Sequence, residues 1–468
     1  MGTGYLKVKA TTKSGNLPVK ADISITHEDQ IIHEIHTNKS GVTDKVPLEA
    51  PPKEEALDPN FMGIPYASYS VMAQAKGFTT VVINGVRIFD TIVSILPINM
   101  EPKLDEISKE NTEDNKEEYH IQVHKLIEQN EYTSPPETQF FASEIQIPGY
   151  INLNITHNEE KRKYTKVAFM DYIKYIASLT IYPSWPPAAI EANIYAIISL
   201  TLHDAYSPDY NITSNQLENH VYANGSQVYD SIVQIVDNIF NRYIKRKEES
   251  QPLYSVYSDG RFITCPGLWQ WGSVSLAKRG YNALEILRHY YPNDVEIIET
   301  DNIMGFEPFP GYTLQEGMSS KHVQLLHVML SCIRINYTAI TEVNPDTCNF
   351  GADTTAAIKT FQEIFMLELD QPTGIVDKNT WYSILSTNTN LRKSRRQPSG
   401  KSAALSRFSR CVIDDDFRES YNVDCIHNND TSFGDETQTK SKEQHISRQL
   451  ITMYMLSQIY AKHAGNYI

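Results

Sequence analysis

The hydrophobic period changes along the chain, and this change divides the chain into domains of different kinds. Apolar and polar residues alternate in four stretches of the first hundred residues, at 4–11, 21–25, 69–75 and 79–83. Beyond about residue 186, apolar residues recur every three or four positions instead. Because strands repeat every two residues and helices every 3.6, we expect a β domain followed by domains rich in helices.

Residues 1–100 are predicted to form a small β-sandwich. Their alternating stretches are separated by turn signals: Asn-Leu-Pro at 16–18, Ser-Gly at 40–41 and Lys-Gly at 76–77. Short strands joined by such turns are typical of two-sheet domains. Residues 101–145 then carry twelve acids against four lysines, a local balance of −8 that is typical of a linker.

Two further domains and a tail follow. Residues 146–300 are predicted to be mixed α/β, with a strand at 151–155 and helical patterns at 186–203, 228–243, 275–279 and 283–290. Residues 310–388 show three helical patterns punctuated by glycines, at 323–333, 353–365 and 379–385. The tail, 389–468, starts with a run of bases and ends with a candidate amphipathic helix. The expected fold class is therefore multidomain α+β.

Composition excludes several classes of function. The formal net charge of −15 argues against general nucleic-acid binding, which depends on a basic surface. No stretch approaches 18 consecutive apolar residues, so no transmembrane segment is expected, and no apolar signal core opens the chain.

The cysteines suggest neither a metal site nor a disulfide scaffold. They form no CxxC pair and no cluster at zinc spacing, so no metal or other cofactor is expected. Their number is odd and small, which favours reduced thiols, although Cys411 and Cys425 could pair in an exported protein. The five are Cys265, Cys332, Cys348, Cys411 and Cys425.

Two blocks of the central region resemble a known family. The first is Phe-Met-Asp-Tyr-Ile-Lys-Tyr-Ile-Ala-Ser-Leu-Thr-Ile-Tyr-Pro-Ser-Trp-Pro at 169–186. The second runs from Gln-Trp-Gly-Ser at 270–273 through Leu-Ala-Lys-Arg-Gly-Tyr at 276–281 to Tyr-Tyr at 290–291. In this order they resemble the opening and closing motifs of the domain shared by stage II sporulation protein D and the SleC-like spore cortex-lytic proteins.

The 310–388 region resembles the three-helix peptidoglycan-binding domain. The resemblance rests on Phe-Gly at 350–351, Phe-Gln at 361–362, Gly374 and Thr-Trp at 380–381. It implies that Phe361 lies inside the bundle while Gln362 and Trp381 serve glycan binding. His327 stands where the family has a glutamine, and Thr-Cys at 347–348 replaces an Asp-Gly turn.

The first domain is similar to the N-terminal β-sandwich of SleC-like proteins, through Leu-Pro at 17–18 and Ala-Lys-Gly-Phe at 75–78. In that family this region is removed during activation, which implies a proprotein and an activating protease as a partner.

The family is thought to cleave peptidoglycan as lytic transglycosylases, which need one carboxylic acid to protonate the leaving oxygen. That acid is a Glu two residues before the Tyr-Pro pair, and Thr180 occupies the position here. A threonine hydroxyl is no general acid near neutral pH. Weak substitutes are Glu191, at a helix position that is more often simply solvated, and Glu218. Asp171 and Asp204 are nearby alternatives that more often cap or flank helices.

The remaining polar and aromatic residues of the two blocks are candidate sugar contacts. Aromatic faces stack on sugar rings and a glutamine amide can bond hydroxyls. Each tryptophan can equally be a core residue. The candidates in this domain are Tyr182, Trp185, Tyr222, Gln270 and Trp271.

Three hypotheses follow. The first is a SleC-like peptidoglycan-binding protein of the spore or cell envelope whose cleavage is impaired, acting alone or beside an active hydrolase. The second is a working lytic transglycosylase that uses a substitute acid, and the third is a protein–protein adaptor. The bases at 392–410 either attract an anionic partner, such as a teichoic acid, or form a solvated linker.

Overall fold

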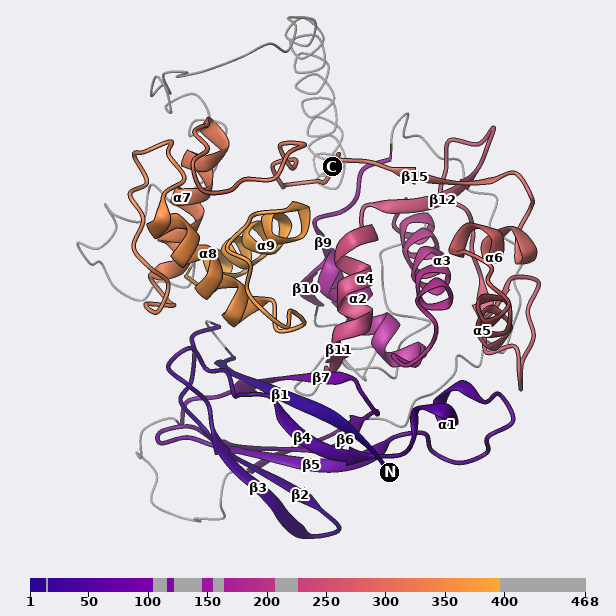
Figure 1. Ribbon diagram of the computed structural model, residues 1–468, viewed down its shortest axis with the longest axis horizontal. Helices are drawn as coiled ribbons and strands as arrows, with labels where there is room; N and C mark the ends of the chain where they lie inside the picture. The colour runs from indigo at the N-terminus through magenta and orange to yellow at the C-terminus, as the bar shows by residue number, and fades with distance from the viewer. Residues whose placement is uncertain (14–15, 104–115, 122–144, 155–163, 207–225, 396–468) are drawn as a thin grey trace, which may run out of the picture. The chain divides into compact units, whose positions relative to one another are not determined.

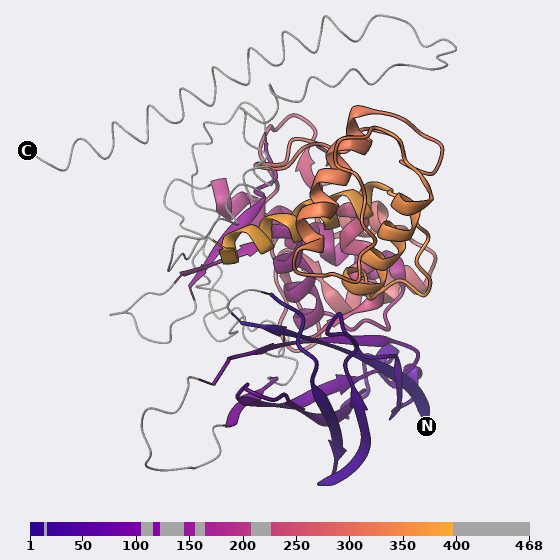
Figure 2. The ribbon, with the colours of Figure 1, turned by 90° about the vertical axis from the view of Figure 1, so that its left-hand side faces the viewer.

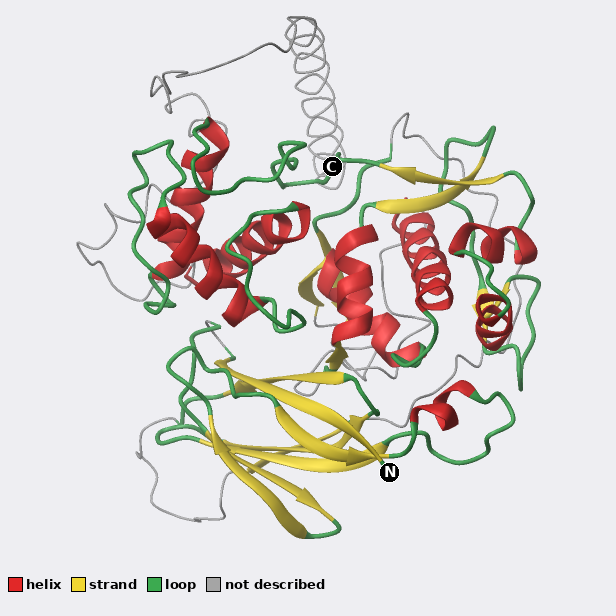
Figure 3. Ribbon diagram, viewed as in Figure 1, coloured by secondary structure: helices red, strands yellow, loops and turns green. Residues whose placement is uncertain are grey.

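A computed structural model describes residues 1–13, 16–103, 116–121, 145–154, 164–206 and 226–395. All of these belong to one compact unit, Met1–Asn422. Helices and strands are mixed, and the strands concentrate in the N-terminal domain (Figure 3). The α+β class with an N-terminal sandwich, a mixed central domain and a helical C-terminal domain is confirmed.

The N-terminal domain is a sandwich of two sheets (Figures 1 and 2). One sheet has the order β11-β7-β1-β4, with β1 Gly2–Thr12, β4 Val46–Ala50, β7 Val93–Met100 and β11 Val228–Tyr229. The other has the order β3-β2-β5-β6-β8, with β2 Asp22–His27, β3 Gln30–His36, β5 Ala67–Gln74, β6 Thr80–Ile88 and β8 Lys116–His120. Every second residue of β1 from Gly4 to Ala10 is buried between the sheets, as the alternation predicts.

Two of these strands come from outside the first hundred residues. β8 lies within the acidic stretch and pairs in parallel with β6, so residues 116–120 belong to the sandwich rather than to a linker. β11 comes from the central domain and pairs with β7, Tyr229 opposite Ser94. The central domain therefore supplies an edge strand to the N-terminal sheet.

The central domain surrounds the long helix α3, Pro187–Tyr206. Pro187 opens this helix, where the absence of an N–H costs nothing. Helices on several sides contact α3. They are α2 Phe169–Thr180, α4 Asp230–Ile239, α5 Gln270–Lys278 and α6 Ala283–Tyr290. The strands of the domain are β9 Tyr150–Asn154, β10 Tyr164–Ala168, β12 Arg242–Arg246, β13 Tyr257–Ser258, β14 Leu268–Trp269 and β15 Val295–Glu299.

The helix predicted over 228–243 is shorter in the structure. α4 covers Asp230–Ile239, while the residues on either side form β11 and β12. β12 pairs antiparallel with β15 along its whole length. Pairing with distant strands has overridden the local helical pattern at both ends.

The C-terminal domain contains three helices: α7 Lys321–Arg334, α8 Ala352–Phe365 and α9 Lys378–Arg395. α7 begins at Ser320, whose hydroxyl accepts a hydrogen bond from the N–H of Val323 and so caps the helix. The sequence predicts all three, with α9 extending ten residues beyond its predicted end at 385. The candidate helix at 446–459 lies outside the described residues. Along the described ranges, no helix has both the length and the apolar character that crossing a bilayer requires.

Buried charges from all three domains lie close together. The Nζ of Lys174 on α2 lies 2.6 Å from a carboxylate oxygen of Asp237 on α4. The Nζ of Lys7 on β1 donates to the carbonyl of Leu367 at 2.8 Å, beside the buried Glu368. Burial, reinforced by the charge of Asp237, raises the pKa of Glu368 to about 7.

Replacing Glu368 tests this junction. A raised carboxyl pKa means that the folded chain binds more protons than the unfolded chain between about pH 4.5 and 7. The ionised side chain therefore destabilises the fold, and this cost is complete above pH 7. Glu368→Gln should therefore raise the free energy of unfolding more at pH 8 than at pH 4. The two changes in free energy should differ by a few kcal/mol, since one pKa unit is about 1.4 kcal/mol.

Urea unfolding of both proteins at the two pH values measures this difference. Glu363→Gln, on the exposed face of α8, makes the same substitution outside the junction and is the matched control. An effect of Glu368→Gln that is the same at pH 4 and pH 8 would contradict the assignment.

Candidate functional site

Three aromatic rings of the two resembling blocks meet in the central domain. Tyr182 and Trp185 lie in the turn between α2 and α3, and Trp271 lies in the first turn of α5. The ring centroids of Trp185 and Trp271 are 5.0 Å apart, and that of Tyr182 lies 5.7 Å from Trp185 and 6.0 Å from Trp271. The structure thus brings together three of the predicted sugar contacts.

These rings are covered. Trp185 is 3% exposed and Trp271 is 5% exposed. Tyr182 is half-buried, and burial raises its pKa to about 12. Phe89 of the N-terminal domain lies against Tyr182 with a centroid separation of 5.8 Å. The N-terminal domain thus contributes to the burial of this cluster.

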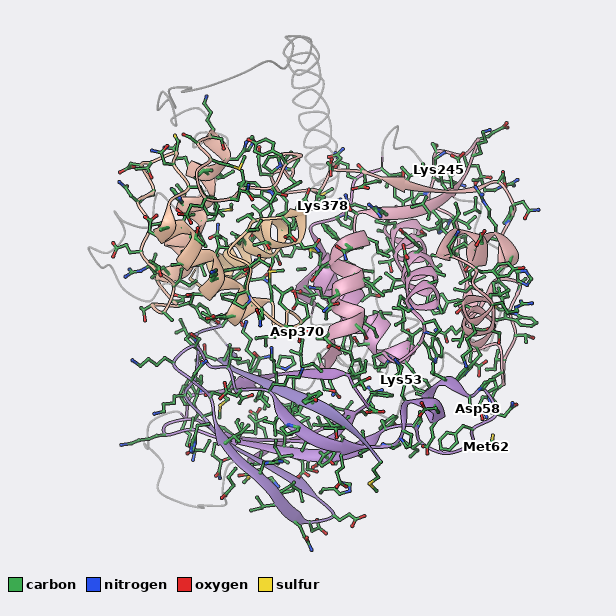
Figure 4. All side chains as sticks on the ribbon, in the orientation of Figure 1. Lys53, Asp58, Met62, Lys245, Asp370 and Lys378 are labelled. Carbon is green, nitrogen blue, oxygen red and sulfur yellow. The ribbon has the colours of Figure 1, made fainter. Side chains whose placement is uncertain are left out.

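Part of the cover is a segment of the N-terminal domain, residues 51–66, which contains the short helix α1, Lys53–Leu57. Lys53, Asp58 and Met62 mark its course in Figure 4. Three side chains of the central domain donate hydrogen bonds to its carbonyl groups. Trp185 Nε1 reaches Ala56 at 3.1 Å, Lys278 Nζ reaches Leu57 at 2.7 Å and an Arg261 Nη reaches Phe61 at 3.1 Å.

Thr180 ends α2 and is 1% exposed. Its hydroxyl donates to the carbonyl of Ile176 one turn earlier, at 2.9 Å, and its own carbonyl accepts from Gln270 Nε2 at 3.2 Å. Both contacts are structural, because a threonine that back-bonds within its helix has used its only proton. Gln270, fully buried, joins the end of α2 to the start of α5.

The candidate acids are dispersed. Asp171 is in the first turn of α2, nine residues before Thr180, which is about 14 Å along the helix. Asn193 faces α5 through a 2.9 Å bond to Ser273, so Glu191, two residues away on α3, lies on the opposite side of that helix. Glu191 contacts Tyr195 there. The side chain of Asp204, and Glu218 and Tyr222 altogether, lie outside the described residues.

Asp259 is a buried carboxylate that the sequence did not single out. It is 2% exposed, and its oxygens accept from the N–H groups of Arg261, Phe262 and Ile263 at 2.8–3.2 Å. The Asp-Gly dipeptide at 259–260, a turn signal, is the feature that could have indicated it. These three hydrogen bonds fix the loop at 259–263.

In the C-terminal domain, Gln362 is buried and bonded inward. Its Nε2 lies 3.1–3.2 Å from Thr373 Oγ1, the carbonyl of Ile375 and Thr380 Oγ1, and its Oε1 accepts from the N–H of Gly374 at 2.9 Å. Gly374 has a φ of +74°, which glycine adopts readily. Gln362 therefore fixes the turn between α8 and α9.

Trp381 and His327 are also interior residues. Trp381 is fully buried and its Nε1 donates to the carbonyl of Glu307 at 3.1 Å. His327 Nδ1 donates to the carbonyl of Thr347 at 3.0 Å, so its Nε2 accepts from the Thr354 hydroxyl at 2.9 Å. Burial lowers the pKa of His327, which keeps this neutral form. The substitution for the family's glutamine thus retains two hydrogen bonds.

The expectation of reduced thiols is wrong for two cysteines of this domain. Cys332 and Cys348 are both disulfide-bonded, whereas Cys265 in the central domain is a buried free thiol. Cys411 and Cys425 lie outside the described residues. Within the described ranges, no three His, Cys, Asp or Glu side chains gather as a metal site would need.

Comparison with known families identifies the C-terminal domain. Residues 322–384 match the family described as "Putative peptidoglycan binding domain". The match starts one residue inside α7 and ends within α9, so it includes all three helices. No curated protein matches the chain. The chain thus has a domain that supports a peptidoglycan-binding role and a place at the cell envelope.

Removing the Gln362 amide should destabilise the C-terminal domain. Gln362→Leu leaves the N–H of Gly374 and the hydroxyl of Thr380 without their buried partner, at a cost of about 3 kcal/mol. Urea unfolding measures this cost. Gln315→Leu, at an exposed position before α7, is the control and should change stability by less than about 0.5 kcal/mol. Equal losses in the two variants would contradict the role given to Gln362.

Proposed function

We propose that this protein binds peptidoglycan of the spore cortex or cell wall as a SleC-like protein, with glycan cleavage impaired by Thr180. The family match of residues 322–384 carries the binding half of the proposal. The resemblance of the central blocks to the stage II sporulation protein D-type domain carries the other half. The polymer is the expected partner, and an active hydrolase is a further one.

The hydrogen bond that the Thr180 hydroxyl donates within its helix supports impaired cleavage. Its proton bonds the carbonyl of Ile176, so it offers no acid to a leaving oxygen. Asp259 is a buried residue whose carbonyl accepts from the N–H of Trp271, and its carboxylate accepts from three backbone N–H groups. Loss of general-acid catalysis lowers rates by about 10²–10⁴-fold.

A working lytic transglycosylase is the second candidate. It requires a carboxyl beside the anomeric centre, and Glu191 faces Tyr195 instead. This candidate therefore depends on Glu218, or on a rearrangement that frees another acid. An adaptor that uses the sandwich for protein contacts is the third candidate, and the peptidoglycan-binding domain argues against it as the sole role.

Sedimentation with insoluble peptidoglycan separates these candidates. The purified chain should pellet with cortex or wall peptidoglycan but not with chitin, which lacks the muramyl units. Under the same conditions it should release no anhydromuramyl fragments, while an active lytic transglycosylase added to a parallel sample does. Release by the chain alone would establish the second candidate, and failure to pellet would favour the adaptor.

We also propose that the N-terminal domain acts as a pro-region that masks the aromatic cluster. The 51–66 segment covers Trp185 through the three hydrogen bonds donated to Ala56, Leu57 and Phe61. Proteolytic activation would remove this cover.

Weakening the cover should expose the cluster. The double variant Arg261→Ala/Lys278→Ala removes two of the three donors, so the 51–66 segment should be cut at least several-fold faster by a limiting protease, and pelleting with peptidoglycan should increase. The control pair, Lys247→Ala/Arg279→Ala, removes two charges of the same sign at exposed positions that do not supply the three donors to that segment. Faster cutting with unchanged pelleting would reject masking while leaving binding by the C-terminal domain intact.

A further inference from the structure

Arg87 is a buried cation without a counter-ion among the described residues. It lies on β6, is 3% exposed, and its Nε and one Nη have no hydrogen-bond partner. None of the ion pairs formed by the described residues includes it. An unpaired buried charge costs several kcal/mol, so its persistence calls for an explanation.

The main chain holds Arg87 firmly in place. Gln227 Oε1 accepts from the Arg87 N–H at 3.0 Å, and Gln227 Nε2 donates to the Arg87 carbonyl at 2.6 Å. Ser94 also donates to that carbonyl, at 2.8 Å. The Arg87 guanidinium and the Phe89 ring both lie near the Tyr66 ring, and Phe89 lies against Tyr182 and Tyr229. The guanidinium is thus directed at the junction between the sandwich and the central domain.

Tyrosine side chains surround the guanidinium. Its central carbon lies 5.8 Å from the ring centroid of Tyr66. Burial raises the pKa values of Tyr175, Tyr182 and Tyr229 to about 12, and the positive charge of Arg87 opposes that rise in all three. Phenols with such pKa values are neutral and can donate a proton.

The unsatisfied groups at this place are donors. The hydroxyl of Tyr229, a fully buried residue, has no partner, like the two Arg87 nitrogens. Guanidinium has no acceptor atom, and a phenol beside a cation turns its oxygen toward that cation and its proton outward. A group of preorganised donors with one positive charge in a low-dielectric surrounding fits an anion with several acceptor oxygens, and the planar guanidinium matches a carboxylate best.

We propose that Arg87 and Tyr229 form a binding site for a small carboxylate at the junction of the sandwich and the central domain. The carboxylate accepts from the guanidinium and from the Tyr229 hydroxyl, and so neutralises the buried charge. It comes either from a free small acid or from the lactyl group of a muramic acid. This site is independent of the proposed function, because neither the C-terminal domain nor Thr180 takes part in it.

Thermal unfolding of the full chain with added ligands tests the site. A ligand that binds only the folded chain raises the melting temperature in a saturable way. The probes are sodium acetate, N-acetylmuramic acid, and N-acetylglucosamine, which lacks the lactyl carboxylate. Sodium chloride at equal ionic strength serves as the reference. We expect acetate and N-acetylmuramic acid to raise the melting temperature by several degrees and N-acetylglucosamine to have no effect.

Variants connect the effect to the two residues. Arg87→Met should abolish the shift, and without ligand it should be at least as stable as the natural chain because an unpaired buried charge is removed. Tyr229→Phe removes one hydroxyl and should weaken the apparent affinity about tenfold, the loss of one charge-assisted hydrogen bond. Arg279→Met, at an exposed arginine of the central domain, is the control and should retain the full shift.

The outcomes are distinct. A shift with acetate supports a free acid as ligand, and a shift with N-acetylmuramic acid alone supports the sugar-linked carboxylate. The proposal is overturned if neither carboxylate shifts the natural chain, if N-acetylglucosamine is equally effective, or if Arg87→Met keeps the shift. Should Arg87→Met fail to fold, Tyr229→Phe decides the matter, since undiminished affinity in that variant also overturns the proposal.

Discussion

The pairing of β11 with β7 is the contact on which the arrangement of the central domain depends. Only two residue pairs are involved, Val228 with Ile95 and Tyr229 with Ser94, but Gln227 beside them closes two more hydrogen bonds with the main chain of Arg87. Through these bonds the central domain becomes part of the N-terminal sheet. Phe89 is thereby brought against Tyr182 and Tyr229, which buries the aromatic cluster.

The C-terminal and central domains differ in what their candidate binding residues do in the fold. The C-terminal bundle matches a peptidoglycan-binding family and stands on conventional core residues such as Phe361 and Trp381. The central domain brings together the aromatic residues predicted to contact sugars, but they are packed together beneath the sandwich. The hydroxyl of Thr180 bonds within its own helix, and the amide of Gln270 donates to the carbonyl of Thr180.

Periodic segments could be predicted from the sequence, and segments shaped by distant partners could not. The strands β1, β2, β5 and β6 and the helices α7 and α8 follow from alternation and 3.6-residue spacing, because each depends on its own buried face. The ends of α4 are set instead by pairing with β7 and β15, which lie far away in sequence.

The candidate site shows the same limit. A resemblance placed Tyr182, Trp185 and Trp271 in one predicted sugar site, and the structure brings their rings within 6.0 Å of one another. The sequence could not show that they are covered, because the covering segment, residues 51–66, has no periodic pattern and lies more than a hundred residues away. Similarly, the role of Gln362 depends on the positive φ of Gly374, which a local pattern does not reveal.

The oxidised cysteines of the C-terminal domain bear on the compartment in which the protein folds. Disulfides persist in oxidising compartments and are rare where glutathione and thioredoxin keep thiols reduced. The bonds at Cys332 and Cys348 therefore agree with the place at the cell envelope that the peptidoglycan-binding domain supports.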